Sequence, residues 1–261
     1  MKHILSRVNA SHLRILVEPP ALLAFDFDGT LAPIVARPGQ AALRKEMVLA
    51  LKRLAALYPC VVISGRSRKD LAARLKGIPL KAIIGNHGAE FEAGIAPPAQ
   101  VAGWHRQIRR DLAAHAGVEI ENKQYSISVH IRLARNKRAA RKAVWGVATS
   151  LTGARLVRGK QVLNIVPLDA MDKGLALAHV MKRLGARRAL FVGDDLTDED
   201  VFRRAETLRV IGVRMGRSGS SSAAYYLRGI EALERMMGLL VSWREGATQP
   251  HEIKTPRQRK N

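Results

Sequence analysis

The amino-acid sequence predicts an α/β fold with a doubly wound parallel sheet, into which a smaller α+β unit is inserted. Short apolar runs that end in polar clusters alternate with segments of helical periodicity over residues 21–84 and again over residues 171–213. Such alternation is typical of parallel sheets that are covered by helices on both faces. Between the two stretches, predicted helices accompany strands of alternating polarity, which favours an antiparallel unit. We therefore expect a core of residues 1–96 and 169–261 and an insert of residues 97–168.

The first part of the core is expected to contain three strands and two helices. The strands are short apolar runs that stop at Asp, Ser-Gly or Gly-Asn, at residues 21–27, 60–63 and 81–84. The helices carry apolar residues at helical spacing, at residues 41–57 and 69–75. Pro19 and Pro20 end any earlier helix, so the first 17 residues form either a short helix or a loose arm.

The insert and the second part of the core are read in the same way. In the insert we expect helices at residues 101–115 and 137–151, strands at residues 118–123, 125–132, 154–157 and 161–166, and a turn at residues 158–160. In the core we expect helices at residues 171–184 and 198–205, strands at residues 189–192 and 208–213, and a helix at residues 220–244 that breaks at Gly229. The polar, basic tail from Gln249 is expected to be disordered.

Composition excludes several classes of protein. The chain has 261 residues, of which 47% are hydrophobic and 25% are charged, so disorder over the whole length is excluded. The single cysteine, Cys60, excludes a disulfide framework and a cysteine-based zinc site. No run reaches the roughly 20 apolar residues of a membrane-spanning helix, and the N-terminus lacks the apolar core of a signal peptide. We expect a soluble, cytoplasmic monomer with no membrane partner.

Net charge is the unusual quantity, because 44 Lys+Arg and 22 Asp+Glu give +22. Such a charge attracts polyanions such as nucleic acid, anionic membranes or phosphorylated small molecules, or it gives a solvated basic surface without a specific partner. The insert is especially basic, with 13 Lys+Arg and 3 Asp+Glu over residues 97–168. Its aromatic residues Trp104, Tyr125 and Trp145 are widely separated, and no helix-turn-helix or finger pattern is present. We therefore expect no specific nucleic-acid partner.

Two groups of acids follow predicted strands. Asp26 and Asp28 end the first apolar run, at the strand end where open α/β sheets bind ligands. Burying such acids costs free energy unless they are paired or bind a cation, although Asp-Gly is also common in exposed turns. The second group has five acids in the seven positions 194–200, and carboxylate oxygens suit Mg²⁺. Instead of binding a metal, Glu199 and Asp200 could stabilise the next helix by lying at its partly positive N-terminus.

Two further positions suit a phosphate group. Ser64 follows a strand and precedes a helix, which places a hydroxyl and backbone amides at a helix start. Lys173 begins another helix after a polar loop. Taken separately, Ser64 could be a helix cap and Lys173 a surface lysine. Their order along the chain, between the acid pair and the acid cluster and always at a strand end or a helix start, favours one phosphate-handling site.

This ordered set resembles the haloacid dehalogenase-like phosphatases, and longer blocks resemble the trehalose-6-phosphate phosphatases. The blocks are Asp-Gly-Thr-Leu-Ala-Pro-Ile at 28–34, Ile-Ser-Gly-Arg at 63–66, Gly-Asn-His-Gly-Ala-Glu at 85–90, Glu-Asn-Lys at 121–123, Ser-Val-His-Ile-Arg at 128–132, Asp-Lys-Gly at 172–174 and Gly-Asp-Asp-Leu-Thr-Asp-Glu-Asp at 193–200. They extend from about residue 21 to residue 226. The resemblance implies a Rossmann-like core with a cap, and a Mg²⁺-dependent enzyme that converts trehalose 6-phosphate into trehalose and phosphate.

The resemblance also implies a role for each catalytic residue. Asp26 attacks the phosphorus and forms an aspartyl-phosphate, which divides one difficult step into two. Asp28 protonates the leaving sugar oxygen and then activates water. Ser64 and Lys173 bind the phosphate oxygens.

The metal and substrate residues are implied in the same way. Mg²⁺ is held by Asp26, Asp194 and the backbone carbonyl of Asp28, and Asp198 orients either the water shell of the metal or Lys173. The implied substrate-binding residues are Arg66, Asn86, His87, Gly88, Glu121, Lys123, Arg132 and Asn164. Among these, Glu121 and Lys123 of the insert are expected to close over the sugar hydroxyls.

One position departs from the family pattern. That pattern resembles Gly-Lys-x-Val-x-Glu-Ile-x-Pro, whereas residues 159–167 place Asn164 where a sugar-binding Glu is expected. Asparagine keeps hydrogen-bonding capacity but lacks the charge. The phosphatase chemistry is unaffected, and a phosphatase for another glycosyl phosphate, of the sucrose or glucosylglycerol type, is the alternative. A basic nucleic-acid-binding protein is an alternative of a different class.

Overall fold

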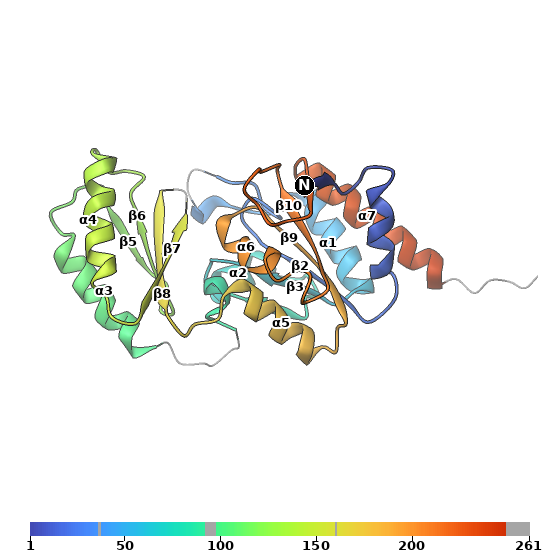
Figure 1. Ribbon diagram of the computed structural model, residues 1–261, viewed down its shortest axis with the longest axis horizontal. Helices are drawn as coiled ribbons and strands as arrows, with labels where there is room; N and C mark the ends of the chain where they lie inside the picture. Colours follow the sequence, from blue (N-terminus) through green and yellow to red (C-terminus); the bar gives the residue numbers. More distant parts are fainter. Residues whose placement is uncertain (36–37, 92–97, 160, 249–261) are drawn as a thin grey trace, which may run out of the picture.

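A computed structural model of the chain describes residues 1–35, 38–91, 98–159 and 161–248. The molecule has a larger and a smaller α/β unit side by side, and α7 lies at the far end of the larger one (Figure 1). The predicted boundary between residues 96 and 97, the predicted turn residue Lys160 and the predicted disordered tail from Gln249 lie outside the described residues.

The larger unit is built on a seven-stranded parallel sheet, which confirms the predicted fold class. Its strands are β1 (Lys2–His3), β2 (Ala21–Phe25), β3 (Cys60–Ile63), β4 (Ala82–Ile84), β9 (Arg188–Gly193), β10 (Val210–Met215) and β11 (Tyr225–Leu227). Their order is β1-β11-β10-β9-β2-β3-β4, and all pairs are parallel. The helices are α1 (Lys45–Leu57), α2 (Arg68–Arg74), α5 (Lys173–Arg183), α6 (Glu199–Phe202) and α7 (Ile230–Thr248).

Helices cover both faces of this sheet, which is why its strands are apolar along their whole length. In β2, Leu23 and Phe25 face one side and pack in the cluster that contains the apolar residues of α1 and α7. Leu22 and Ala24 face the other side, where α5 and α6 pack. Because successive side chains of a strand alternate between faces, a strand buried on both sides needs an unbroken apolar run.

The smaller unit is antiparallel and lies between β4 and α5 in the sequence. Its elements are α3 (Ala99–Asp111), β5 (Glu119–Asn122), β6 (Ile127–His130), α4 (Lys137–Thr149), β7 (Ala154–Gly159) and β8 (Val162–Pro167), with strand order β5-β6-β8-β7. One sheet face packs Val129 and Ile165 against Trp104 of α3 and Val144 of α4. The helices lie on the side away from the core, so the opposite face of the sheet looks toward the core (Figure 1).

The prediction of a helix over residues 220–244 was wrong in its first third. Residues Tyr225–Leu227 form β11, which pairs with β10 and with β1, and α7 begins only after Gly229 at φ +135°. Aromatic residues such as Tyr225 and Tyr226 favour strands, and this segment forms hydrogen bonds with β10 on one side and with β1 on the other. The N-terminal residues supply one of those strands, β1, and then a 3₁₀ helix, η1 (Asn9–Leu16), with Leu13 and Leu16 buried in the core.

Other boundaries moved by a few residues. Helix α1 begins at Lys45 rather than at residue 41, and α6 is one turn, Glu199–Phe202, preceded by the 3₁₀ turn η4 (Leu196–Asp198). Two further short 3₁₀ segments are η2 (Pro38–Gln40) and η3 (Asn86–Gly88). Among the described residues, no helix combines the length and the apolar character needed to cross a membrane.

Candidate active site

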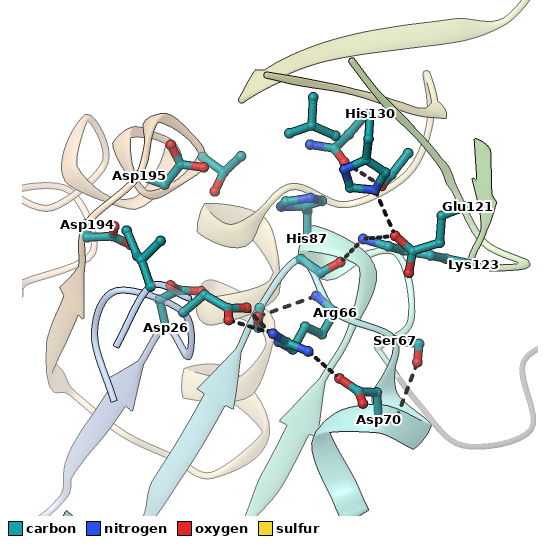
Figure 2. A pocket seen from close by; sticks show the side chains of 18 of the residues that line it. Asp26, Arg66, Ser67, Asp70, His87, Glu121, Lys123, His130, Asp194 and Asp195 are labelled. Carbon is teal, nitrogen blue, oxygen red and sulfur yellow. Dashed lines mark hydrogen bonds and ion pairs between the residues drawn. The ribbon is translucent and has the colours of Figure 1, made fainter. Parts of the chain in front are cut away.

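Three neighbouring strands end at one edge of the core sheet. β9, β2 and β3 lie side by side, and Asp194, Asp26 and Ser64 are the first residues after them. A cavity of about 440 Å³ opens there, between the strand ends and the inward face of the small sheet (Figure 2). The predicted site residues that line it are Asp26, Asp28, Ser64, Arg66, His87, Glu121, Lys123, Arg132, Asn164, Lys173 and Asp194.

Lys173 is buried between two carboxylates. Its Nζ donates to Asp26 Oδ1 at 2.8 Å and to Asp198 Oδ1 at 2.7 Å, and at most 5% of each side chain is exposed. Burial alone would lower the pKa of Lys173, but Asp198 and Asp26 outweigh that effect and raise it well above its ordinary value. Lys173 is therefore a buried lysine held between two carboxylates, and the surface-lysine interpretation is wrong.

Asp26 is the acid on which these groups converge. Its N–H donates to the carbonyl of Val192 at 2.9 Å, so the β2–β9 ladder fixes its backbone. Burial raises the pKa of Asp26, Lys173 opposes that rise, and the nearby carboxylates of Asp198 and Asp194 add to it. A carboxylate in this position is held by one lysine and lies at the cavity wall, and it is not an exposed turn acid.

Asp26, Asp194 and Asp198 together could hold a metal ion. One carboxylate oxygen from each lies within 4.8 Å of the others. Asp194 Oδ1 is buried and has no hydrogen-bond partner among the described residues. Burial, with Asp198 and Asp195, raises the pKa of Asp194 to about 7. Such a set of oxygens, one of them unsatisfied, fits a hard cation such as Mg²⁺, which prefers carboxylate ligands and relieves their mutual repulsion.

A glycine makes the close approach of Asp194 possible. Gly29 has φ +78°, and a Cβ there would overlap the Asp194 carboxylate. Only glycine meets both demands at once, a left-handed backbone and no side chain. The Asp-Gly pair of the first motif is therefore required by packing against the second acidic cluster.

The Asp28 side chain pairs with an arginine of the core. Its two oxygens accept from Arg66 Nε at 2.6 Å and from Nη2 at 2.7 Å, while Arg66 Nη1 donates to Asp70 at 2.8 Å. Asp28 is 41% exposed and Arg66 only 11%. The Asp28 carboxylate thus lies at the mouth of the cavity, held by a guanidinium that the core supplies.

Ser64 is almost fully buried, with 1% of its surface exposed. Its Oγ accepts from the Arg66 N–H at 3.4 Å, a long contact. The N-cap of α2 is Ser67, whose Oγ accepts from the Asp70 N–H at 3.3 Å. The interpretation of Ser64 as the helix cap is therefore wrong, and its hydroxyl lines the cavity instead.

The cap face of the cavity is a row of polar side chains across three strands. Glu121, Ser128 and Asn164 are partners in register on β5, β6 and β8, and Ser128 Oγ donates to Asn164 Oδ1 at 2.6 Å. Glu121 Oε2 pairs with His130 Nε2 at 3.1 Å. That hydrogen bond lowers the pKa of Glu121. The row therefore offers several hydrogen-bonding groups to a polyhydroxyl ligand.

Lys123 connects the cap to the core. Its Nζ donates to the carbonyl of Gly65 at 3.0 Å and lies 3.8 Å from Glu121. Burial lowers the pKa of Lys123. The lysine thus bridges the two walls of the cavity directly beside Ser64 and Arg66.

Residues 24–228 match the trehalose-phosphatase family. The chain belongs to this family. It is 30% identical over 259 residues to a trehalose 6-phosphate phosphatase of Zea mays, covering 88% of this chain and 72% of the relative. It is 34% identical over 203 residues to a trehalose-phosphate phosphatase of Mycobacterium ulcerans, covering 72% of this chain and 52% of the relative. The chain thus spans about half the length of that bacterial relative.

Solved structures share the fold. The C-terminal domain of trehalose-6-phosphate phosphatase from C. albicans has a TM-score of 0.74 at 20% identity, covering 90% of this chain and 97% of that one. A structure of trehalose-6-phosphate phosphatase from Aspergillus fumigatus has a TM-score of 0.65 at 24% identity, covering 93% and 99%. At these identities the likeness concerns the architecture alone.

Three predicted site residues do not line the cavity. Asp198 lies behind it and holds Lys173. Asn86 is buried, and its side chain accepts from Ser126 Oγ at 2.8 Å and donates to Glu90 at 2.9 Å, so it joins the cap to the core. Gly88, at φ +111°, packs against the carbonyl of Asp172, where a Cβ would not fit.

Sequence reasoning did not single out Ser128 and His130, which also line the cavity. Both stand on β6 two residues apart, so they share a face. The available signals were the block at residues 128–132, which contains both residues, and strand periodicity, whereas the register to Glu121 is known only from the structure. The cluster residues Glu199 and Asp200 lie elsewhere: Glu199 accepts from the Ser222 N–H, and Asp200 pairs with Arg203.

Proposed function

We propose that the protein hydrolyses trehalose 6-phosphate to trehalose and phosphate, with Mg²⁺ as cofactor. Membership of the trehalose-phosphatase family supports the substrate class. The observation that carries the proposal is the Asp26 carboxylate, anchored by Lys173 at a strand end and opening onto a cavity shared with Asp28 and the cap. The monomeric state and the cytoplasmic location stay predictions from the sequence.

In the first step a carboxylate oxygen of Asp26 attacks phosphorus. The new Asp26 O–P bond forms as the bond from phosphorus to the sugar oxygen breaks, and Asp28 gives that oxygen its proton. Lys173 fixes the nucleophile at 2.8 Å and contributes positive charge beside the phosphoryl group. Ser64 lies at the same wall and can donate its hydroxyl hydrogen to a phosphate oxygen.

In the second step water attacks the aspartyl-phosphate. Asp28 accepts the proton from water, phosphate leaves, and the Asp26 carboxylate is restored. In the structure both Asp28 oxygens are occupied by Arg66. Before the first step, Arg66 must therefore move to another anion, which the phosphate of the substrate supplies, and Asp28 must take up from solvent the proton that it then gives to the sugar oxygen.

Asp26, Asp194 and the backbone carbonyl of Asp28 would hold Mg²⁺, with Asp198 behind them. A bound Mg²⁺ supplies positive charge that reduces the repulsion between the nucleophile and the phosphate. The unsatisfied Asp194 Oδ1 supports this assignment.

The cap determines the sugar in this proposal. Glu121, Lys123 and Asn164 face the cavity above the strand ends, so they can bind sugar hydroxyls while the phosphate lies on Asp26. Asn164, in place of the family's Glu, favours one second candidate, a phosphatase for another glycosyl phosphate.

Phosphate release from a panel of sugar phosphates, with Mg²⁺ and with a chelator, tests the proposal. We expect trehalose 6-phosphate to give the highest kcat/KM and Asp26→Asn to abolish turnover while the fold, followed by circular dichroism, is kept. Faster hydrolysis of another glycosyl phosphate would transfer the assignment to the second candidate. More than a few per cent of residual activity in Asp26→Asn would contradict the mechanism itself.

A further inference from the structure

A second cavity of about 550 Å³ lies on the outer side of the cap, on the other face of the same small sheet. Its residues come from β6, α4, β7 and β8. Neighbouring residues of β8 serve the two cavities, since Leu163 faces this one and Asn164 faces the catalytic one. Helix α4 lies on the side of the cap away from the core (Figure 1). Val162, the first residue of β8, lines both cavities, whereas the basic residues of the outer cavity do not line the catalytic one.

Positive charge surrounds this outer cavity without compensation. The exposed side chains of Arg138, Arg141 and Lys142 of α4 and of Arg158 of β7 line it, and no carboxylate of the described part of the chain does. None of the four forms an ion pair with a carboxylate of the described residues. Like charges three and four residues apart on one helix repel each other, and cations near a helix N-terminus are disfavoured. A ligand that carries negative charge would remove both penalties.

The floor of the cavity is apolar. Val129, Ile131, Val144 and Leu163 line it and are at most 7% exposed. Trp145 stands at the rim with 38% of its surface exposed, and the Arg158 guanidinium lies 4.3 Å from its ring centroid. A volume of this size, with an apolar floor and a few converging polar groups, is typical of small-molecule sites. A flat basic surface for a long polyanion would need neither the floor nor the depth.

We propose that this outer cavity binds an organic phosphate. The four basic side chains hold the phosphate, since arginine matches its oxygens in pairs and several cations balance more than one negative charge. The apolar or flat body of the ligand packs on the floor and against Trp145. The proposal is independent of the phosphatase activity, because none of the four basic side chains contacts the catalytic cavity.

The test is calorimetric titration with ADP in chelator, where hydrolysis does not interfere. The parent is compared with Arg141→Ala/Arg158→Ala and with the matched pair Arg106→Ala/Arg109→Ala, which removes the same charge from exposed positions of α3. All are first checked for hydrolysis of p-nitrophenyl phosphate, which shows that they are folded. We expect one ADP per chain, at least tenfold weaker binding in the first pair, and a change below twofold in the second.

Two further titrations complete the design. Trp145→Phe should weaken ADP binding several-fold and leave pyrophosphate binding unchanged, because pyrophosphate has no flat body. No ADP binding by the parent at millimolar concentration would overturn the proposal. Equal weakening of ADP binding by both arginine pairs would also overturn it. So would an oligonucleotide that binds more tightly than ADP and whose binding both pairs weaken equally. In either case the positive charge would form a diffuse surface for polyanions.

Discussion

Arg66 holds both carboxylate oxygens of Asp28, at 2.6 and 2.7 Å, while a third nitrogen of the same guanidinium holds Asp70 at 2.8 Å. Two acids thus share one arginine, but only Asp28 lies two residues from Asp26. Burial alone would raise the pKa of Asp70, but its hydrogen bonds from Arg74 and Arg66 outweigh that effect and lower it. The contact of Arg66 with Asp70 is therefore interpreted as structural, and its contact with Asp28 as part of the catalytic site.

Asp28→Asn is therefore expected to lower kcat by about 10²–10⁴-fold, the usual contribution of general acid–base catalysis. An amide cannot give a proton to the sugar oxygen or take one from water. The matched variant Asp70→Asn removes a carboxylate from the same arginine and should change kcat by less than about threefold. Steady-state phosphate release measures both. Equal losses in the two variants would show that Asp28 only positions Arg66.

The fold could be predicted to a large extent because its signals are local. The strand Cys60–Ile63 was predicted to the residue, since a short apolar run rich in β-branched residues between Pro59 and Ser64-Gly65 favours a buried strand. The strand Tyr225–Leu227 was not, because it is defined by pairing with β10 on one side and with β1, more than 220 residues earlier in the chain, on the other. The two residues of β1, Lys2 and His3, are too few to show a periodicity from which a strand could be predicted.

The candidate site divides in the same way. Asp26, Ser64 and Asp194 follow apolar runs of a predicted parallel sheet, whose strand ends are the usual place for a ligand, and the structure shows that their three strands are neighbours. The partners of the neighbouring side chains could not be predicted, because they depend on side-chain rotamers and on the register between strands. The sequence analysis considered Ser64 as a possible cap of α2, whereas the hydrogen bond that Ser67 Oγ accepts from the Asp70 N–H shows that Ser67 is the cap. The contact between Ser128 and Asn164 spans 36 residues and follows from strand pairing alone.

Metal removal is expected to stop phosphate release, and Mg²⁺ should restore it. A readout independent of activity is the melting temperature, because a cation that binds only the folded chain stabilises it by about 2.7 kcal/mol at 100 times its Kd. Asp194→Asn should abolish this Mg²⁺-induced shift. Asp169→Asn, which changes an exposed acid outside the cavity, should keep it. A shift that survives in Asp194→Asn would place the cation elsewhere.

Acid should destabilise the protein through His87. Burial lowers the pKa of His87 well below its ordinary value of 6.5, and Lys173, Lys123 and Arg155 lower it further. The unfolded chain then binds the proton more readily than the folded one, so the free energy of unfolding falls as the pH drops below about 6.5. The slope approaches about 1.4 kcal/mol for each pH unit.

The comparison that isolates this effect is urea unfolding of the parent and of His87→Asn between pH 7 and pH 5. Asparagine tolerates the positive φ of +58° at this position and does not titrate there. The stability gap between parent and variant should therefore narrow toward pH 5. His12→Gln, at an exposed histidine, should leave the slope unchanged. A parallel pH dependence of parent and His87→Asn would contradict the prediction.

Glu121→Ala/Lys123→Ala should separate sugar recognition from chemistry. Charge-assisted hydrogen bonds are worth about 1.5–3 kcal/mol each, so kcat/KM for the true sugar phosphate should fall by roughly tenfold to over a hundredfold per residue. Hydrolysis of p-nitrophenyl phosphate needs no sugar contact and should fall little. If both substrates lose activity equally, the Lys123 contact to Gly65 supports the phosphate wall rather than the sugar.

Asn164→Glu tests the sugar directly. Asn164 is 7% exposed, and its Oδ1 already accepts from Ser128, a bond that a glutamate oxygen can keep while its second oxygen reaches the cavity. If trehalose 6-phosphate is the substrate, the added charge-assisted contact should maintain or raise kcat/KM, by up to about a hundredfold. Asn164→Gln has the same length without the charge and is the matched control. If Asn164→Glu destroys activity on the best substrate of the panel while Asn164→Gln retains it, the negative charge itself is rejected. The cap would then be adapted to a different sugar, whereas the chemistry at Asp26, on the opposite wall of the cavity, would stand unchanged.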